Sequence, residues 1–112
     1  MPDFGDPFAG NDLGRKMTKP ELIRAMRFAI AAEYEAVQLY EQIAEASEDE
    51  LAATVLRDVA KEEVVHAGEF LKVLAILEPS EVDHYQEGNK EVMEIREKMA
   101  HRVARSFVRK VL

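Results

Sequence analysis

Three residues of the chain have the types and the spacing of metal ligands: Glu33, Glu63 and His66. Each interrupts a series of apolar residues that recur every three or four positions, which is the spacing of one helix face. Ionised groups on a face that packs against a neighbour are costly unless they are paired or bind a metal, and this apolar stripe contains no Lys or Arg. These positions therefore predict a metal site built from carboxylate and imidazole ligands.

Two long helices must position these ligands. Thr18 and Glu21 form a capping box that starts the first helix, which we expect to run to about residue 46. A second capping box, Ser47 to Glu50, starts the next helix, which ends before Pro79. Their apolar stripes are expected at Leu22, Met26, Ala29, Ile30, Val37, Tyr40 and Ala44, and at Leu51, Val55, Val59, Phe70, Leu74 and Leu77.

The connection between these helices is so short that they must be antiparallel. A turn centred near residue 48 places Glu33 level with residue 63, so Glu33, Glu63 and His66 are expected to converge. One Glu plus a Glu-x-x-His pair is half of the di-iron carboxylate ligand set, which needs four Glu and two His. The sequence therefore predicts a di-iron (Fe) site shared between two subunits, completed when two copies pair.

The remaining segments are expected to flank this hairpin. Residues 1–17 are predicted to form a flexible N-terminal arm, 18–79 the helical hairpin that carries the metal ligands, and 80–112 a short helix and a C-terminal assembly helix. The short helix is expected to close at Gly88, with Asn89 capping the last one. The predicted fold is all-α: an antiparallel two-helix hairpin plus a C-terminal helix, dimerising into a four-helix bundle.

Composition narrows the chemistry further. The 112 residues include no Cys, which excludes disulfides, zinc fingers, iron–sulfur clusters and thiol nucleophiles. No apolar run approaches the roughly 18 residues of a membrane span, and no leader is visible, so we expect a cytoplasmic protein without a membrane partner. The net charge of −7 disfavours nucleic acid. Residues 90–112 are basic, which we interpret as a solvated face or a contact with the acidic body of a neighbour.

Several nearby residues have two interpretations. Tyr40, seven residues after Glu33, is expected either to bond a ligand carboxylate or to be an aromatic core residue. Glu35, Glu62 and Glu69 flank the stripe, where they could guide incoming metal or simply face solvent. The ligand triad itself could instead be a buried polar network that only specifies how two copies pair.

Two segments also resemble a known family. Residues 33–40 (EYEAVQLY) and 60–70 (AKEEVVHAGEF) are similar to the rubrerythrin-like branch of the ferritin superfamily, and most of all to the encapsulated ferritins. The resemblance runs from about Thr18 to Pro79. It implies a half-ferritin whose hairpin dimerises to make a ferroxidase centre, with a third helix that helps to join dimers into an open ring.

The resemblance also implies roles for individual residues. Glu33, Glu63 and His66 would be iron ligands, Tyr40 a catalytic neighbour of them, and Glu35 an outer carboxylate that captures incoming metal. The sequence departs from the pattern of the encapsulated ferritins in two places. Ala32 stands where some relatives carry a further acidic residue, and residues 106–112 lack a Gly- and Leu-rich shell-targeting tail. Some relatives are fused to the shell protein.

The function predicted from residues and resemblance together is that of a ferroxidase, an oxidoreductase that converts Fe(II) to Fe(III) for iron storage with oxygen or peroxide. The chain is expected to be a homo-oligomer, a ring of dimers, and the cargo of an encapsulin nanocompartment. The alternatives are a rubrerythrin-like peroxidase, which without Cys would need a separate electron donor, a non-catalytic helical assembly module, and a cation site without turnover.

Overall fold

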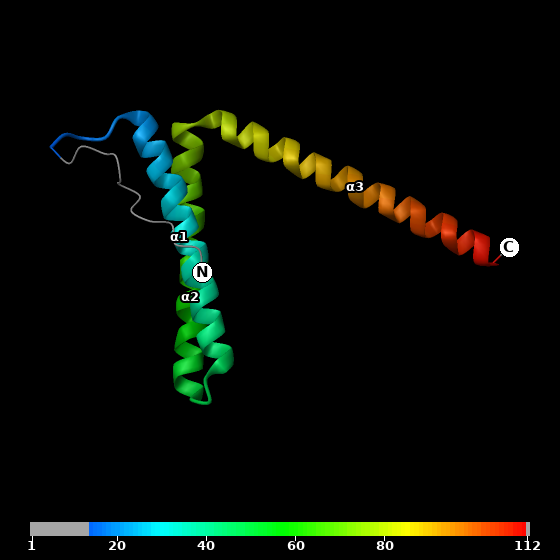
Figure 1. Ribbon diagram of the computed structural model, residues 1–112, viewed down its shortest axis with the longest axis horizontal. Helices are drawn as coiled ribbons and strands as arrows, with labels where there is room; N and C mark the ends of the chain where they lie inside the picture. The colour runs from blue at the N-terminus through cyan, green and yellow to red at the C-terminus, as the bar shows by residue number, and fades with distance from the viewer. Residues whose placement is uncertain (1–13, 112) are drawn as a thin grey trace. The chain divides into compact units, whose positions relative to one another are not determined.

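The structure, a computed structural model, describes residues 14–111, and this part of the chain is all helical. Its helices are α1 (Lys19–Ala46), α2 (Glu50–Leu77) and α3 (Pro79–Val111). Helices α1 and α2 lie side by side as an antiparallel hairpin (Figure 1). The predicted all-α class is therefore confirmed. Most of the predicted arm, and Leu112, lie outside the described residues.

The start of α1 follows the predicted capping box. The Glu21 backbone N–H donates to Thr18 Oγ1 at 3.3 Å, and the Thr18 backbone N–H donates to Glu21 Oε1 at 3.0 Å. The sequence did not predict a third participant, Arg15, whose guanidinium donates to both Glu21 oxygens at 2.7 and 3.3 Å. This contact attaches residue 15 to the first turn of α1 and leaves Glu21 8% exposed.

The turn between α1 and α2 corrects one prediction. Asp49, not Ser47, caps α2: its side chain accepts from the Ala52 backbone N–H at 2.8 Å. Ser47 instead ends α1, and its hydroxyl accepts from the Asp49 backbone N–H at 3.1 Å. The second helix therefore begins at Glu50, after a connection of three residues.

The seam between α1 and α2 is narrower than the predicted stripes. Its buried residues recur every seven positions in α2, and small side chains there let the two helices approach closely. Leu51 and Val55, expected on this stripe, are 75% and 52% exposed, so their predicted burial was wrong. The buried seam consists of Ile23, Ile30 and Ala44 on α1 and Ala53, Ala60, Ala67 and Leu74 on α2.

The segment after Pro79 is one helix, not two. Pro79 ends α2, as predicted, but also opens α3, where its missing N–H has no intrahelical role. Gly88 does not close a short helix, because α3 continues through it to Val111. The chain divides into two units at this point, Glu78 ending the first and Pro79 beginning the second, and each is described by itself. None of the helices within residues 14–111 is long and apolar enough to span a membrane.

Candidate metal centre

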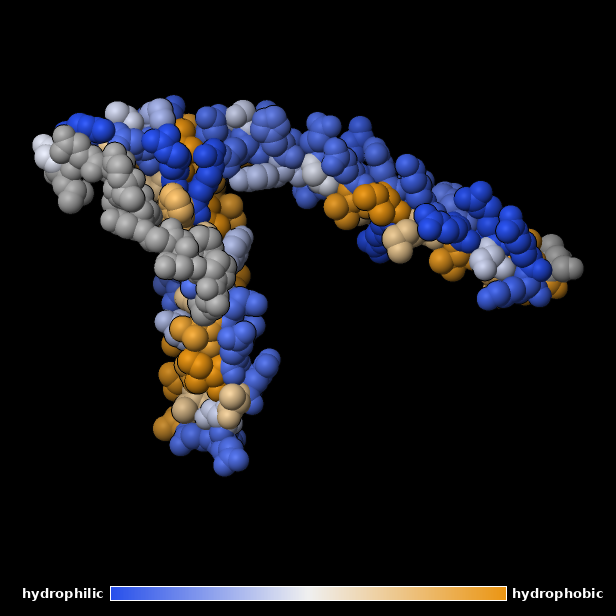
Figure 2. All heavy atoms as spheres, in the orientation of Figure 1, coloured by the Kyte–Doolittle hydropathy of each residue, from blue (hydrophilic) through white to orange (hydrophobic). Residues whose placement is uncertain are grey.

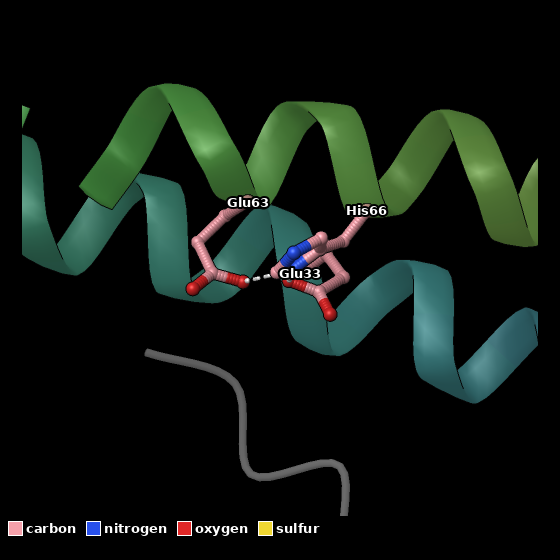
Figure 3. A group of neighbouring side chains, drawn as sticks. All are labelled: Glu33, Glu63 and His66. Atoms are coloured by element: carbon pink, nitrogen blue, oxygen red, sulfur yellow. Dashed lines mark hydrogen bonds and ion pairs between the residues drawn. The ribbon is translucent and has the colours of Figure 1, made fainter. Parts of the chain in front are cut away.

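The predicted ligand residues occupy equivalent positions on α1 and α2. Glu33 follows the seam residue Ile30 by three positions, while Glu63 and His66 follow the seam residue Ala60 by three and six. Residues at these offsets lie on the same flank of a helix. Because the hairpin is antiparallel, the two flanks lie on the same side of it, and the three side chains converge there (Figure 3).

The convergence is close enough for one metal ion to be shared. Ligand atoms of Glu33, Glu63 and His66 all lie within 4.8 Å of one another, the only such group among the residues the structure describes. His66 Nδ1 lies 3.3 Å from Glu63 Oε2 and 3.7 Å from Glu33 Oε2. The prediction that these three residues meet is therefore consistent with the geometry.

Glu33 carries an unusual polar atom. Its Oε2 is buried and has no hydrogen-bond partner, because the 3.7 Å separation from His66 is too long for a hydrogen bond. A buried acceptor without a partner is destabilising, and native proteins seldom keep one without a purpose. A cation at this position would satisfy it.

The protonation of the group follows from the proximity of its members. The neighbouring Glu63 carboxyl group, and after it burial, raises the pKa of Glu33, whereas the proximity of Glu33 lowers the pKa of Glu63. A hydrogen bond to Glu63 raises the pKa of His66. Without metal, Glu33 therefore binds a proton more readily than Glu63 does, and a divalent cation would compete with that proton.

The donor set restricts the kind of metal that this group could bind. It combines carboxylate oxygens and an imidazole nitrogen without thiolate, a combination that suits iron and manganese and excludes soft-metal sites. The side chains of Glu33 and Glu63 are 16% and 18% exposed, whereas that of His66 is 45% exposed. Any further ligands to a metal bound here would have to approach from the solvent-exposed side of His66.

Two other predicted site residues do not contact Glu33, Glu63 or His66. Tyr40 lies seven residues after Glu33, on the same flank of α1, but it is half-buried and makes no hydrogen bond to the three ligand residues within the described part of the chain. Glu35 lies outside the group of ligand atoms. The roles of both residues therefore remain predictions.

Comparison with known proteins agrees with this geometry. Residues 25–105 match the family model "Rubrerythrin". The chain is 46% identical over 84 residues to a "Ferritin-like-encapsulin shell fusion protein" of Pyrococcus furiosus, covering 75% of this chain and 24% of that protein. It is 40% identical over 73 residues to the "Encapsulin nanocompartment cargo protein EncC" of Myxococcus xanthus, covering 65% of this chain and 56% of that protein.

A solved structure shares the fold. The encapsulated ferritin domain from Pyrococcus furiosus superposes with a TM-score of 0.70 at 46% sequence identity, covering 71% of this chain and 82% of that one. The chain spans about a quarter of the fusion protein's length and just over half of EncC's. The family match covers most of the chain and includes all three converging residues. The chain therefore belongs to the rubrerythrin family of ferritin-like helical domains.

Proposed function

We propose that this chain is a ferroxidase whose di-iron site forms between two copies. The observation that carries the proposal is the convergence of Glu33, Glu63 and His66 within 4.8 Å on one side of the hairpin. One copy supplies two carboxylates and one imidazole. Two copies related by a two-fold axis supply four carboxylates and two imidazoles, the complete ligand set of ferritin-like di-iron proteins.

The same face has the composition of a self-interface. The flank that holds Glu33 continues through Met26 and Tyr40, and the flank that holds Glu63 continues through Phe70 and Leu77. Apart from the ligands, these residues are apolar or aromatic, which suits burial against a second hairpin. Pairing through this face would bring both sets of ligands together and exclude water around them.

In the proposed reaction Fe(II) is the substrate. Two ferrous ions give up one electron each, and dioxygen that takes two electrons and two protons leaves as hydrogen peroxide; with peroxide as oxidant, two waters leave instead. The protein's part is to bind two cations at a fixed separation and to neutralise their charge with four carboxylates. Metal binding needs the ionised carboxylate of Glu33, whose pKa is raised, so binding should weaken as the pH falls.

We further propose that the chain works with an encapsulin shell. Two of its relatives are named as an encapsulin cargo protein and as a fusion to an encapsulin shell. A domain that oxidises iron without enclosing a cavity needs a separate place for the ferric product, and a shell would provide it. The protein would then act inside a nanocompartment in the cytoplasm.

The test compares aerobic Fe(II) oxidation by wild type, Glu63→Gln and Asp58→Asn. Asp58 is an exposed carboxylate of α2 outside the ligand group, so its variant controls for the loss of one acidic side chain. We expect Glu63→Gln to lose most of the activity and Asp58→Asn to keep it. Wild-type rates in Glu63→Gln would refute the assignment.

Metal analysis separates the alternatives. Iron bound without oxygen consumption would identify a cation site without turnover, and stable dimers that bind no metal would identify an assembly module. A peroxidase would turn over with peroxide only when an electron donor is added.

A further inference from the structure

His66 is the least enclosed of the three converging side chains, with 45% of it exposed. Its Nδ1 atom lies 3.3 Å from Glu63 Oε2, so this edge of the imidazole ring faces the other ligand residues (Figure 3). The second ring nitrogen, Nε2, points away from that contact and makes no hydrogen bond within residues 14–111. One nitrogen of the ring therefore belongs to the metal centre, and the other is available to a further group.

A metal-bound imidazole needs a partner for its second nitrogen. In the proposed function, on which this inference rests, Nδ1 of His66 binds the metal, so the proton of the neutral ring must sit on Nε2. Ligand histidines almost always donate this second N–H to a carboxylate, a backbone carbonyl or a water. Such a partner fixes the tautomer and the orientation of the ring and makes it a stronger ligand.

Few side chains on α2 can reach the ring of His66. On a helix surface these are the side chains one turn away, three or four residues before or after. Glu62 and Glu63 precede His66, and Glu69 and Phe70 follow it. Glu63 already lies at Nδ1, and Phe70 has no acceptor atom. Two exposed carboxylates are left as candidates, Glu62 and Glu69.

The direction of side chains along a helix favours Glu69. Each Cα–Cβ bond is tilted towards the N-terminus of the helix, so a long side chain covers the turn before its own. His66 follows this rule, since its Nδ1 contacts Glu63, three residues earlier. By the same rule the side chain of Glu69 extends back towards His66, whereas that of Glu62 extends away from it.

The charge of Glu69 already acts on the imidazole. The hydrogen bond to Glu63 is the largest of the influences that raise the pKa of His66, and the charges of Glu33, Glu63 and Glu69 raise it further. No hydrogen bond joins Glu69 to the ring within residues 14–111. Because Glu69 is exposed, its side chain can turn onto Nε2 once a metal holds the ring.

We propose that Glu69 is a positioning residue for the metal ligand His66: its carboxylate accepts a hydrogen bond from Nε2–H and keeps Nδ1 directed at the metal. In this role Glu69 contacts neither the metal nor the oxidant and acts through His66 alone. Residues 63, 66 and 69 then form one line along α2, in which a ligand carboxylate, a ligand imidazole and a positioning carboxylate follow at intervals of three.

A general attraction of cations to an acidic surface is the competing explanation for any effect of Glu69. Figure 2 shows hydrophilic residues at many points on the surface of the hairpin, and Glu62 is an equally exposed carboxylate one turn before His66. Removal of Glu62 therefore controls for the loss of one negative charge near the metal centre.

The first test measures Zn(II) affinity by calorimetry of the full-length protein at one fixed concentration. Zn(II) accepts carboxylate and imidazole ligands and has no redox chemistry. We expect Glu69→Ala to bind Zn(II) about 10–100-fold more weakly than wild type. Glu69→Gln should recover most of this loss, because its amide oxygen accepts the same hydrogen bond without a charge. Glu62→Ala should bind like wild type.

The outcomes separate this inference from the proposed function. Wild-type affinity in Glu69→Ala, or an equal loss in Glu62→Ala, would overturn the role of Glu69, and so would a Glu69→Gln protein as weak as Glu69→Ala. If Zn(II) affinity is unchanged in Glu63→Gln, the proposed metal centre itself fails, and the role of Glu69 with it.

The second test is spectroscopic and does not depend on affinity. At saturating Zn(II), ¹⁵N NMR of the imidazoles reports which nitrogen carries the proton and how fast that proton exchanges with water. His84 and His101, both on α3, are internal references. We expect Nε2–H of His66 to exchange slowly in wild type and rapidly in Glu69→Ala. Equal exchange rates in the two proteins would contradict the proposed hydrogen bond.

Discussion

Replacing Glu33 with Leu should make the metal-free protein more stable. The Oε2 atom of Glu33 is buried without a hydrogen-bond partner, and the side chain is only 16% exposed. In the proposed function this carboxylate binds iron. Without iron its burial lowers the free energy of unfolding. An apolar residue of similar length removes the desolvated oxygen and continues the apolar flank between Met26 and Tyr40.

The expected gain in unfolding free energy equals the cost of burying the unpartnered oxygen, which the substitution removes. An unpartnered buried polar group costs about 1–3 kcal/mol of unfolding free energy. For a domain of this size, a gain near the middle of that range, about 2 kcal/mol, corresponds to an increase in Tm of roughly 8–16 °C. Glu45→Leu is the matched control: Glu45 is an exposed carboxylate of the same helix, and a change there should stay within about 0.5 kcal/mol.

The assay is urea unfolding followed by helical circular dichroism, with chelator present and at one fixed protein concentration, because pairing of copies makes stability depend on concentration. Added Fe(II), kept anaerobic, should then raise the midpoint of wild type and Glu45→Leu but not of Glu33→Leu. A metal-free Glu33→Leu protein less stable than wild type would refute the reasoning, since it would mean that the carboxylate is already compensated within the protein.

Three further predictions concern the hairpin outside the metal centre. Leu74, 1% exposed, is the most buried large side chain between residues 14 and 111, and Leu74→Ala should lower the unfolding free energy by about 2–5 kcal/mol in the same urea assay. Gly68→Ala should raise it by roughly 0.5–1 kcal/mol, because a Cβ there meets nothing within 4 Å and alanine is the better helix former; a loss would reveal a neighbour at that surface. The hydrogen bonds from Arg15, then those from Thr18, lower the pKa of Glu21 from 4.5 to about 2, so its contribution to stability is fully present above pH 4.5 and disappears as pH falls through 2. In Arg15→Gln an NMR titration of the Glu21 carboxyl should move upward, towards 4.5, and an unchanged titration would show that Arg15 is not the main cause.

The convergence of the three predicted ligand side chains could be predicted from sequence because helical geometry is periodic. Glu33, Glu63 and His66 are ionisable groups at positions where the pattern requires apolar residues, and a short turn fixes the level at which the helices face each other. Nothing beyond these two facts was needed to place the three side chains together. The unpartnered Glu33 oxygen could not be predicted, because it depends on the rotamers of its neighbours.

The seam was predicted less well, for a physical reason. The sequence pattern marks bulky residues such as Leu51 and Val55, but the helices meet through alanines, whose small size permits close approach and whose hydropathy is weak. Gly88 was likewise interpreted as a helix end, although α3 continues through it, because a single glycine lowers helix stability without ending a helix. The Arg15 contact was missed because it links a non-helical residue to a helix start.

Native mass spectrometry with and without Fe(II) tests most directly the claim that the metal centre is shared between two copies. We predict that iron appears in assemblies with even numbers of copies, at one iron per chain, and that Glu63→Gln assemblies lack it. Single chains that bind iron at the same stoichiometry, or assemblies that never bind it, would contradict a site completed at the interface.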